Sequence, residues 1–265
     1  MRVGMFGAGY VGIVTAAGLA ELGHAVVLHD TDAAKLDALR RGALPIFEPG
    51  LLELVQRGIA SGALRIADDA AAAARAMDIV MVAVGTPSGA GGRADASHVR
   101  DAVATIAATC ERTAIVVNKS TASVGTADAL ASLAGGIAVA ANPEFLREGS
   151  AVHDFFHPDR IVIGCNDPHA EAALRALYAP LDAPVIVTTP RTAELIKYAS
   201  NAFLALKVTF ANEIAAIATA SGVDVTAVLA GAGADPRIGC QGRQGREEPE
   251  GSDEKNDGDG TESRF

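Results

Sequence analysis

Short, almost continuously apolar runs alternate with segments of helical spacing from Met1 to Pro190. Runs of this kind are typical of strands that are covered on both faces of a sheet. The candidate strands are residues 3–6, 25–29, 79–84, 114–118, 137–140, 160–164 and 185–188. Helices are predicted between them, including residues 11–22, 33–40 and 51–60. The alternation predicts an α/β fold with a doubly wound, mostly parallel sheet.

Beyond the last predicted strand the pattern changes. Residues 192–221 keep helical spacing without an internal glycine or proline, which predicts one long helix, and a short helix over residues 225–230 is expected after it. We expect the long helix to begin a truncated helical domain. Within the long helix, Phe203, Leu206 and Phe210 are placed to form an apolar stripe that packs against a second copy of the chain, giving a homodimer. Packing of the stripe on the same chain is the alternative.

The composition changes again at Cys240. Residues 240–265 contain no Val, Ile, Leu or Met and are dense in Gly, Glu, Asp and Arg. Such a segment cannot bury enough apolar surface to offset its ordering entropy, so we expect a disordered polar tail. The predicted organisation is therefore a cofactor domain over residues 1–190, the start of a helical dimerisation domain over residues 191–239, and the tail over residues 240–265.

The overall composition narrows the choice of partners and compartment. The formal net charge of -10 argues against nucleic acid or an anionic membrane surface as a partner. The cysteines Cys110, Cys165 and Cys240 have no CxxC spacing, so neither a disulfide framework nor a metal site is predicted. No stretch is judged long and apolar enough to serve as a dedicated membrane span, and no signal sequence is recognised. We therefore expect a soluble, cytoplasmic protein.

A glycine-rich turn follows the first predicted strand. Residues 7–12 read Gly-Ala-Gly-Tyr-Val-Gly, a GxGxxG pattern between a strand and a helix, which is the context of a Rossmann-type dinucleotide site. In such a site Gly7 permits the tight turn, Gly9 lets the backbone approach a pyrophosphate, and Gly12 lets helix and strand pack closely. Asp30 ends the second strand, where a carboxylate accepts hydrogen bonds from a ribose and repels a 2′-phosphate. The pattern predicts NAD rather than NADP, the alternative being a structural glycine turn.

Two further polar residues fall near the predicted cofactor. Lys35 lies just beyond Asp30, and Thr86 stands between the candidate strand over residues 79–84 and Pro87. Ligands of doubly wound sheets collect at this edge, so both side chains are placed to approach NAD. A solvated lysine and an ordinary turn are the alternatives.

Acidic, basic and amide side chains follow the later strands. Thr121 ends one strand, and Glu144 and Glu148 follow the next at a spacing that puts them on one face if their segment forms a helical turn. Lys197 and Asn201 lie one turn apart on the long helix. Taken singly, each glutamate can cap a helix or pair with a nearby arginine, and the lysine can snorkel to solvent. Together, behind a nicotinamide-binding fold, they indicate a dehydrogenase site.

Longer motifs stand in the chain as GAGYVG with Asp30, GALPIFEPGL, KSTASVGT, NPEFLREGSAVHDFFHPDRIVIG and AELIKYASNAFLALKVTFANEIA. They resemble the motifs of UDP-glucose 6-dehydrogenases, which belong to the UDP-glucose/GDP-mannose dehydrogenase family. The resemblance runs from Met1 to about Gly239. GDP-mannose and UDP-N-acetylmannosamine dehydrogenases share the architecture, but NPEFLREGSA, HPDRIVIG and ELIKYASN are most similar to the glucose enzyme.

The resemblance implies an NAD-dependent oxidoreductase of polysaccharide biosynthesis that oxidises the C6 alcohol of UDP-glucose in two steps to UDP-glucuronate. It implies a catalytic set in which Thr121 and Glu144 handle water, Lys197 stabilises an alkoxide or oxyanion, and Asn201 is its hydrogen-bonding neighbour. It implies cofactor contacts from Gly7, Gly9, Tyr10, Val11, Gly12, Asp30, Lys35, Thr86, Thr121 and Glu148, and substrate contacts from Glu144, Phe145, Leu146, Arg147, Glu148, Lys197 and Asn201.

The chain departs from the family pattern near its end. The family has a cysteine nucleophile in a GGxCxPKD-type loop beyond DPRIG, which stands here as residues 235–239, and then a second nucleotide-sugar domain. Neither follows here, where Cys240 lies among Gln and Arg, and an altered coding sequence from about Cys240 is one explanation. We therefore expect no sustained conversion of UDP-glucose to UDP-glucuronate. The alternatives are a noncatalytic NAD-binding or dimerising remnant and a dehydrogenase of another nucleotide sugar.

Overall fold

The computed structural model describes residues 1–92, 94–235 and 237–238. The chain divides into two compact units, Met1–Phe203 and Leu204–Phe265, and each is described by itself. The polar tail predicted over residues 240–265 lies outside the described residues, so its predicted disorder stays a prediction.

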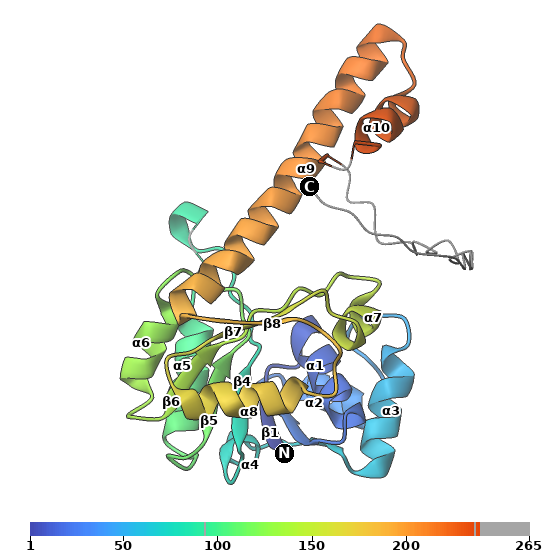
Figure 1. The fold of residues 1–265 in the computed structure, drawn as a ribbon. Helices are drawn as coiled ribbons and strands as arrows, with labels where there is room; N and C mark the ends of the chain where they lie inside the picture. Colours follow the sequence, from blue (N-terminus) through green and yellow to red (C-terminus); the bar gives the residue numbers. More distant parts are fainter. Residues whose placement is uncertain (93, 236, 239–265) are drawn as a thin grey trace, which may run out of the picture. The chain divides into compact units, whose positions relative to one another are not determined.

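An eight-stranded sheet forms the centre of the first unit (Figure 1). Its strands are β1 (Arg2–Phe6), β2 (Ala25–His29), β3 (Leu64–Ile66), β4 (Ile79–Val82), β5 (Ile115–Asn118), β6 (Ala138–Ala141), β7 (Ile161–Gly164) and β8 (Val185–Thr188). Their order is β3-β2-β1-β4-β5-β6-β7-β8, and every neighbouring pair is parallel except β6 with β7. The predicted doubly wound, mostly parallel sheet is confirmed.

Helices cover both faces of this sheet (Figure 1). They are α1 (Tyr10–Glu21), α2 (Ala33–Arg40), α3 (Leu51–Ser61), α4 (Ala70–Ala74), α5 (Ser97–Ala107), α6 (Thr126–Leu133), α7 (Ala151–Phe156) and α8 (Pro168–Tyr178), with a short 3₁₀ turn η1 (Ala90–Gly92). Successive residues of β4 divide between two apolar cores. Ile79 and Met81 join the core that contains residues of α1, α3, α7 and α8, whereas Val80 and Val82 join the core of α4, α5 and α6. Burial on both faces explains why these strands are apolar at every position.

One strand was not predicted from the sequence. Strand β3 has three residues, and its central Arg65 is exposed, so it shows neither a continuous apolar run nor enough length for an alternating pattern. It lies at the edge of the sheet and pairs with β2 alone. The strand predicted over residues 79–84 was also too long, because residues 83–84 lie beyond the end of β4, at the edge where the glycine-rich turn approaches.

The long helix predicted after the sheet is present as α9 (Pro190–Ser221), and it is followed by α10 (Val225–Gly233). Within the described residues, α9 is the helix long and apolar enough to cross a membrane by length and composition. The prediction that no segment meets this test was therefore wrong. The helix meets this criterion because charged residues such as Lys197, Lys207 and Glu213 interrupt its apolar sequence only at wide intervals. A single helix of this kind is weak evidence for a membrane protein.

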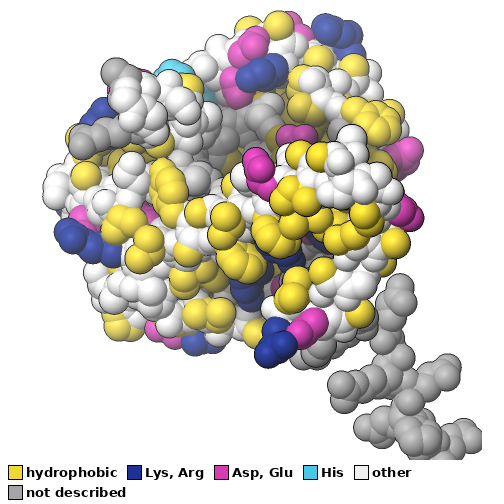
Figure 2. All heavy atoms as spheres, turned by 90° about the horizontal axis from the view of Figure 1, so that it is seen from above, with side chains coloured by type: hydrophobic (Ala, Val, Ile, Leu, Met, Phe, Trp, Pro, Cys, Tyr) yellow, Lys and Arg dark blue, Asp and Glu magenta, His cyan; other side chains and the backbone are white. Residues whose placement is uncertain are grey.

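Charged side chains do not gather into one basic surface on the face that Figure 2 shows. Acidic and basic groups lie close together there in small clusters, with hydrophobic side chains between them.

Candidate active site

The glycine-rich turn connects β1 to α1 and has little room for side chains. Gly7 has φ +108°, and a Cβ atom on it would lie 2.4 Å from the Ala83 carbonyl oxygen. A Cβ on Gly12 would lie 1.8 Å from the Gly7 carbonyl oxygen. A Cβ on Gly9 would meet no atom within 4 Å, so space is open above the turn. Backbone atoms therefore pack closely against Gly7 and Gly12, whereas the space above Gly9 is open. We call this open space the cradle.

Two observations show that this cradle fits a dinucleotide. Helix α1 begins at Tyr10, and no side chain caps its first amides, so they are available to an anion together with the positive end of the helix dipole. Asp30, at the end of β2, accepts hydrogen bonds from the Ala8 amide at 2.6 Å and the Asp32 amide at 2.8 Å. Lys35 Nζ lies 3.8 Å from the Asp30 carboxylate. The carboxylate is thus held beside the turn, where a ribose would lie.

Replacement of Asp30 by alanine is expected to weaken NAD binding by about 1–3 kcal/mol, because a charge-assisted hydrogen bond to the ribose is lost. Calorimetric titration with NAD measures the effect. Asp101→Ala is the matched control, since Asp101 is exposed on α5, away from the turn. Equal NAD affinity in the Asp30 and Asp101 variants would remove Asp30 from the binding site.

A buried ion pair lies at the carboxyl edge of the sheet. Lys197, near the start of α9, places Nζ 2.8 Å from Glu144 Oε1, and both side chains are largely buried. The other carboxylate oxygen of Glu144 accepts the Leu146 amide at 2.6 Å. Lys197 Nζ also lies 5.3 Å from the centre of the Phe145 ring, whose face Arg160 contacts at 3.9 Å. The arrangement joins an acid–base group and a cation in one polar cluster.

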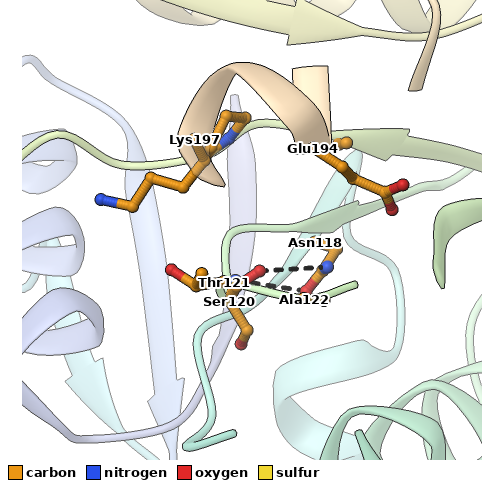
Figure 3. A pocket seen from close by; sticks show the side chains of 8 residues that line it. Asn118, Ser120, Thr121, Ala122, Glu194 and Lys197 are labelled. Carbon is orange, nitrogen blue, oxygen red and sulfur yellow. Dashed lines mark hydrogen bonds between the residues drawn. The ribbon is translucent and has the colours of Figure 1, made fainter. Parts of the chain in front are cut away.

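Figure 3 shows a pocket next to this pair. It is lined by Asn118, Ser120, Thr121, Ala122, Ala141, Pro143, Glu194 and Lys197. Lys197 and Glu194 leave α9 in different directions, and Lys197 extends over the segment that carries Thr121 (Figure 3). The Thr86 hydroxyl donates to the Thr121 carbonyl oxygen at 2.7 Å, which joins the loop after β4 to the loop after β5. The Thr121 backbone is therefore held by the Thr86 side chain, and the Thr121 hydroxyl remains available to water or substrate.

The structure brings some of the predicted site residues together and separates others. Thr121, Glu144 and Lys197 gather at one edge of the sheet. Glu148 is exposed, and the helical turn that would place it on the face of Glu144 is absent, since residues 142–147 form neither a helix nor a strand and α7 begins only at Ala151. Asn201 is one turn beyond Lys197 and exposed, so it does not join the ion pair in this arrangement.

The structure does not show the alternative roles considered for Lys197 and Arg147. Lys197 is 6% exposed and pairs with Glu144, so it does not snorkel to solvent. Arg147 does not pair with either glutamate, because it forms a bidentate interaction with Asp154 at 3.0 and 2.5 Å. Phe145 and Leu146 are half-buried beside the pair.

Sequence reasoning missed Glu48, which lies in the loop before α3. It is 4% exposed and accepts hydrogen bonds from the Tyr10 hydroxyl at 2.6 Å, the Gly149 amide at 2.8 Å and the Ala151 amide at 2.7 Å. Burial is the largest influence and acts to raise the pKa of Glu48, but the hydrogen bonds together outweigh it and leave the pKa below its usual value. The carboxylate therefore fastens the start of α7 to the cofactor turn. The sequence feature that could have pointed to Glu48 is that it is the single acidic residue among the apolar and proline residues 44–49.

We expect Glu48→Gln to lower the free energy of unfolding by about 2 kcal/mol, because the amide nitrogen cannot accept the hydrogen bonds that the lost oxygen received. Urea denaturation measures this change. Glu53→Gln, on the exposed face of α3, is the matched control and should be close to neutral. A Glu48 variant as stable as the control would show that the three hydrogen bonds contribute nothing net.

Glu194 was also missed, and it attaches the start of α9 to the sheet domain. Its carboxylate accepts the Gly125 amide at 2.6 Å and the Ala127 amide at 2.7 Å, so it caps the start of α6 from another helix. Burial is the largest influence and raises the pKa of Glu194, in opposition to these two amides. Lys197 lies one turn further along the same helix, so this cap helps to fix its position.

Comparison with known proteins gives the family of the chain. Residues 1–182 match the NAD binding domain of the UDP-glucose/GDP-mannose dehydrogenase family, and residues 191–246 match its central domain. The chain belongs to this family. The predicted family and its NAD cofactor are thereby confirmed.

Individual members of the UDP-glucose/GDP-mannose dehydrogenase family are similar over most of the chain. UDP-glucose 6-dehydrogenase of Rhizobium meliloti is 48% identical over 253 residues, which cover 91% of this chain and 58% of that protein. The solved UDP-glucose dehydrogenase of Pyrobaculum islandicum is 46% identical with a TM-score of 0.84, covering 90% of this chain and 57% of that one. GDP-mannose dehydrogenase of Pseudomonas aeruginosa has the same TM-score of 0.84 at 36% identity, over 90% and 58% of the two chains. The chain thus spans a little over half the length of these relatives.

Proposed function

We propose that the site carries out the NAD-dependent oxidation of the C6 alcohol of a nucleotide sugar, with UDP-glucose as the substrate. The observation that supports this most is the buried Lys197–Glu144 pair beside Thr121, at the edge of the sheet where the cofactor turn also lies. The higher identity to UDP-glucose dehydrogenases than to the GDP-mannose enzyme favours the glucose substrate.

The residues have distinct parts in the proposed oxidation. NAD, when bound to the cofactor turn, supplies the acceptor for the hydride that leaves C6. Lys197 donates a hydrogen bond to the alcohol oxygen and stabilises the negative charge that forms as its proton leaves. Glu144, held by the Leu146 amide, accepts that proton directly or through a water on the Thr121 hydroxyl. We assign Asn201 to the substrate side, where a bound sugar would meet its exposed amide.

The second oxidation, from aldehyde to acid, needs a nucleophile that these residues do not supply. Among the described residues the thiols are Cys110 and Cys165, and neither lines the pocket. Burial raises the pKa of both thiols, which disfavours the reactive thiolate. We therefore assign the alcohol-to-aldehyde step to this site, and sustained formation of UDP-glucuronate is not expected from the 265-residue chain.

An assay with UDP-glucose and excess NAD, analysed for NADH, aldehyde and UDP-glucuronate, tests this function. We expect slow NADH formation that is lost in Lys197→Met and retained in Glu53→Gln. GDP-mannose and UDP-N-acetylmannosamine in parallel assays test the choice of sugar. NAD binding without NADH formation from any of the three would favour the noncatalytic NAD-binding protein, and many turnovers to UDP-glucuronate would contradict the assignment of the first step alone.

We further propose that the chain forms a soluble, cytoplasmic homodimer, with a cofactor domain over residues 1–190 and a helical dimerisation segment over residues 191–239. The exposed side chains of Phe203, Leu206 and Phe210 on α9 support the dimer, because each is more than half exposed in the single chain. Sedimentation is expected to show a dimer that Leu206→Glu weakens. A monomer at high protein concentration would contradict this proposal.

A further inference from the structure

A second buried lysine lies behind the ion pair, at the end of β5. Lys119 is 6% exposed. Its ammonium lies 3.0 Å from Asn142 Oδ1, 3.4 Å from the Asn142 carbonyl oxygen and 3.4 Å from the Tyr178 hydroxyl. None of the ion pairs among the described residues includes Lys119. All of its hydrogen-bond partners are therefore neutral, although a buried charge is usually paired.

The partners of Lys119 join several elements of the sheet. The Tyr178 hydroxyl, at the end of α8, donates to Asn142 Oδ1 at 2.6 Å, and Asn142 Nδ2 donates to the Val162 carbonyl oxygen of β7 at 2.8 Å. Asn142 follows β6 and precedes Glu144 by two residues, and Lys119 precedes Thr121 by two residues. The Lys119–Asn142 contact thus fixes the spacing of the two segments that carry Thr121 and Glu144.

Two charged groups and one titratable hydroxyl face Lys119. Burial, the largest influence, lowers the pKa of Lys119 from 10.5 to about 8, while the charge of Glu144 raises this pKa and the charge of Lys197 lowers it. Burial also raises the pKa of Tyr178, so that this hydroxyl stays neutral at ordinary pH. When all three charged groups are ionised, two cations face one carboxylate, and the cluster holds one excess positive charge.

We propose that Lys119 is a positioning residue, which holds the Thr121 and Glu144 segments together and places an uncompensated positive charge behind the Glu144–Lys197 pair. This inference rests on the proposed function, in which the negative charge of Glu144 passes to the alcohol oxygen at Lys197 when the carboxylate accepts the alcohol proton. Negative charge that forms there is stabilised by Lys197 in direct contact and by Lys119 at longer range.

The electrostatic coupling is tested first, without substrate or NAD, by titration of the chain labelled with ¹⁵N-lysine. Lys119→Met assigns the Lys119 signal. Glu144→Gln is expected to lower the pKa of Lys119, and Lys197→Met is expected to raise it, because they remove charges of opposite sign. Glu53→Gln, which removes an exposed charge, should leave it unchanged. Shifts of the same sign in both variants, or no shift in either, would overturn the proposal.

The second measurement compares Lys119→Met with Lys119→Arg in the UDP-glucose assay. We expect the turnover rate to fall about tenfold in the methionine variant, with the KM little changed, and to recover in part in the arginine variant, which keeps the charge. NAD affinity, measured by calorimetry, should remain equal in both. Equal rates in the methionine variant and the unaltered chain would overturn the catalytic part of the inference. Absence of NADH from the unaltered chain would contradict the proposed function, while the titration would still decide whether Lys119 senses the pair.

Discussion

Gly12→Ala is expected to lower the free energy of unfolding by about 3 kcal/mol, because the added methyl group overlaps the backbone of the cofactor turn. The Cβ would lie 1.8 Å from the Gly7 carbonyl oxygen and 2.9 Å from the Gly7 carbonyl carbon, and neither atom can move like the end of a flexible side chain. The turn between β1 and α1 must open to relieve this overlap. NAD binding is therefore expected to be lost together with stability. Urea denaturation and calorimetric titration with NAD measure the two effects.

Gly9→Ala is the matched variant that separates these effects. Gly9 has φ -88° and ψ -170°, an extended conformation that alanine adopts without strain, and its Cβ would meet no atom within 4 Å. We expect stability within about 0.5 kcal/mol of the unaltered chain. The methyl group occupies the space where the backbone approaches the pyrophosphate, so NAD affinity should fall about tenfold or more. If Gly9→Ala binds NAD normally, the phosphates do not lie over this turn.

The pH dependence of stability is the second large effect, and it comes from Lys119. Its pKa is about 8 in the folded chain and 10.5 as the ordinary value, so between these pH values the unfolded chain holds a proton that the folded chain has released. The free energy of unfolding therefore rises with pH across this window, by about 3 kcal/mol in total. Below pH 8 both states hold the proton, and the cost of the buried ammonium is present in full.

Lys119→Met isolates this contribution. Burial raises the pKa of Tyr10 and of Tyr178, which lowers stability once the unfolded chain loses the tyrosine protons above about pH 10 in both proteins. The difference between the two proteins therefore cancels the contribution of Tyr10 and reports Lys119 together with any change at its neighbour Tyr178. We expect the unaltered chain to gain stability relative to the methionine variant from pH 8 to 10.5, measured by urea denaturation at several pH values. Parallel curves would show that Lys119 keeps its ordinary pKa.

Errors in the sequence-based interpretation arose where local pattern was a poor guide to packing. The spacing of Glu144 and Glu148 was compatible with a shared helical face, but residues 142–147 after β6 form no helix, and Glu148 is exposed. Glu48 stood in a loop with no repeating pattern, and its three donors come from the cofactor turn and from the segment at Gly149 and Ala151. A carboxylate of this kind is recognised only when the positions of its donors are known.

The sequence by itself determined the sheet apart from its edge strand β3, the cofactor turn and the family. These depend on short-range rules, since apolar runs reflect burial on both faces, and the overlap that requires glycine at position 12 involves a backbone atom only five residues away. Only the tertiary structure decided which charges meet. Lys197 reaches Glu144 across 53 residues, and Glu48 reaches Gly149 across 101. Such contacts leave no periodic signal in the chain, because their geometry is set by how the strand ends and helix starts are arranged in space.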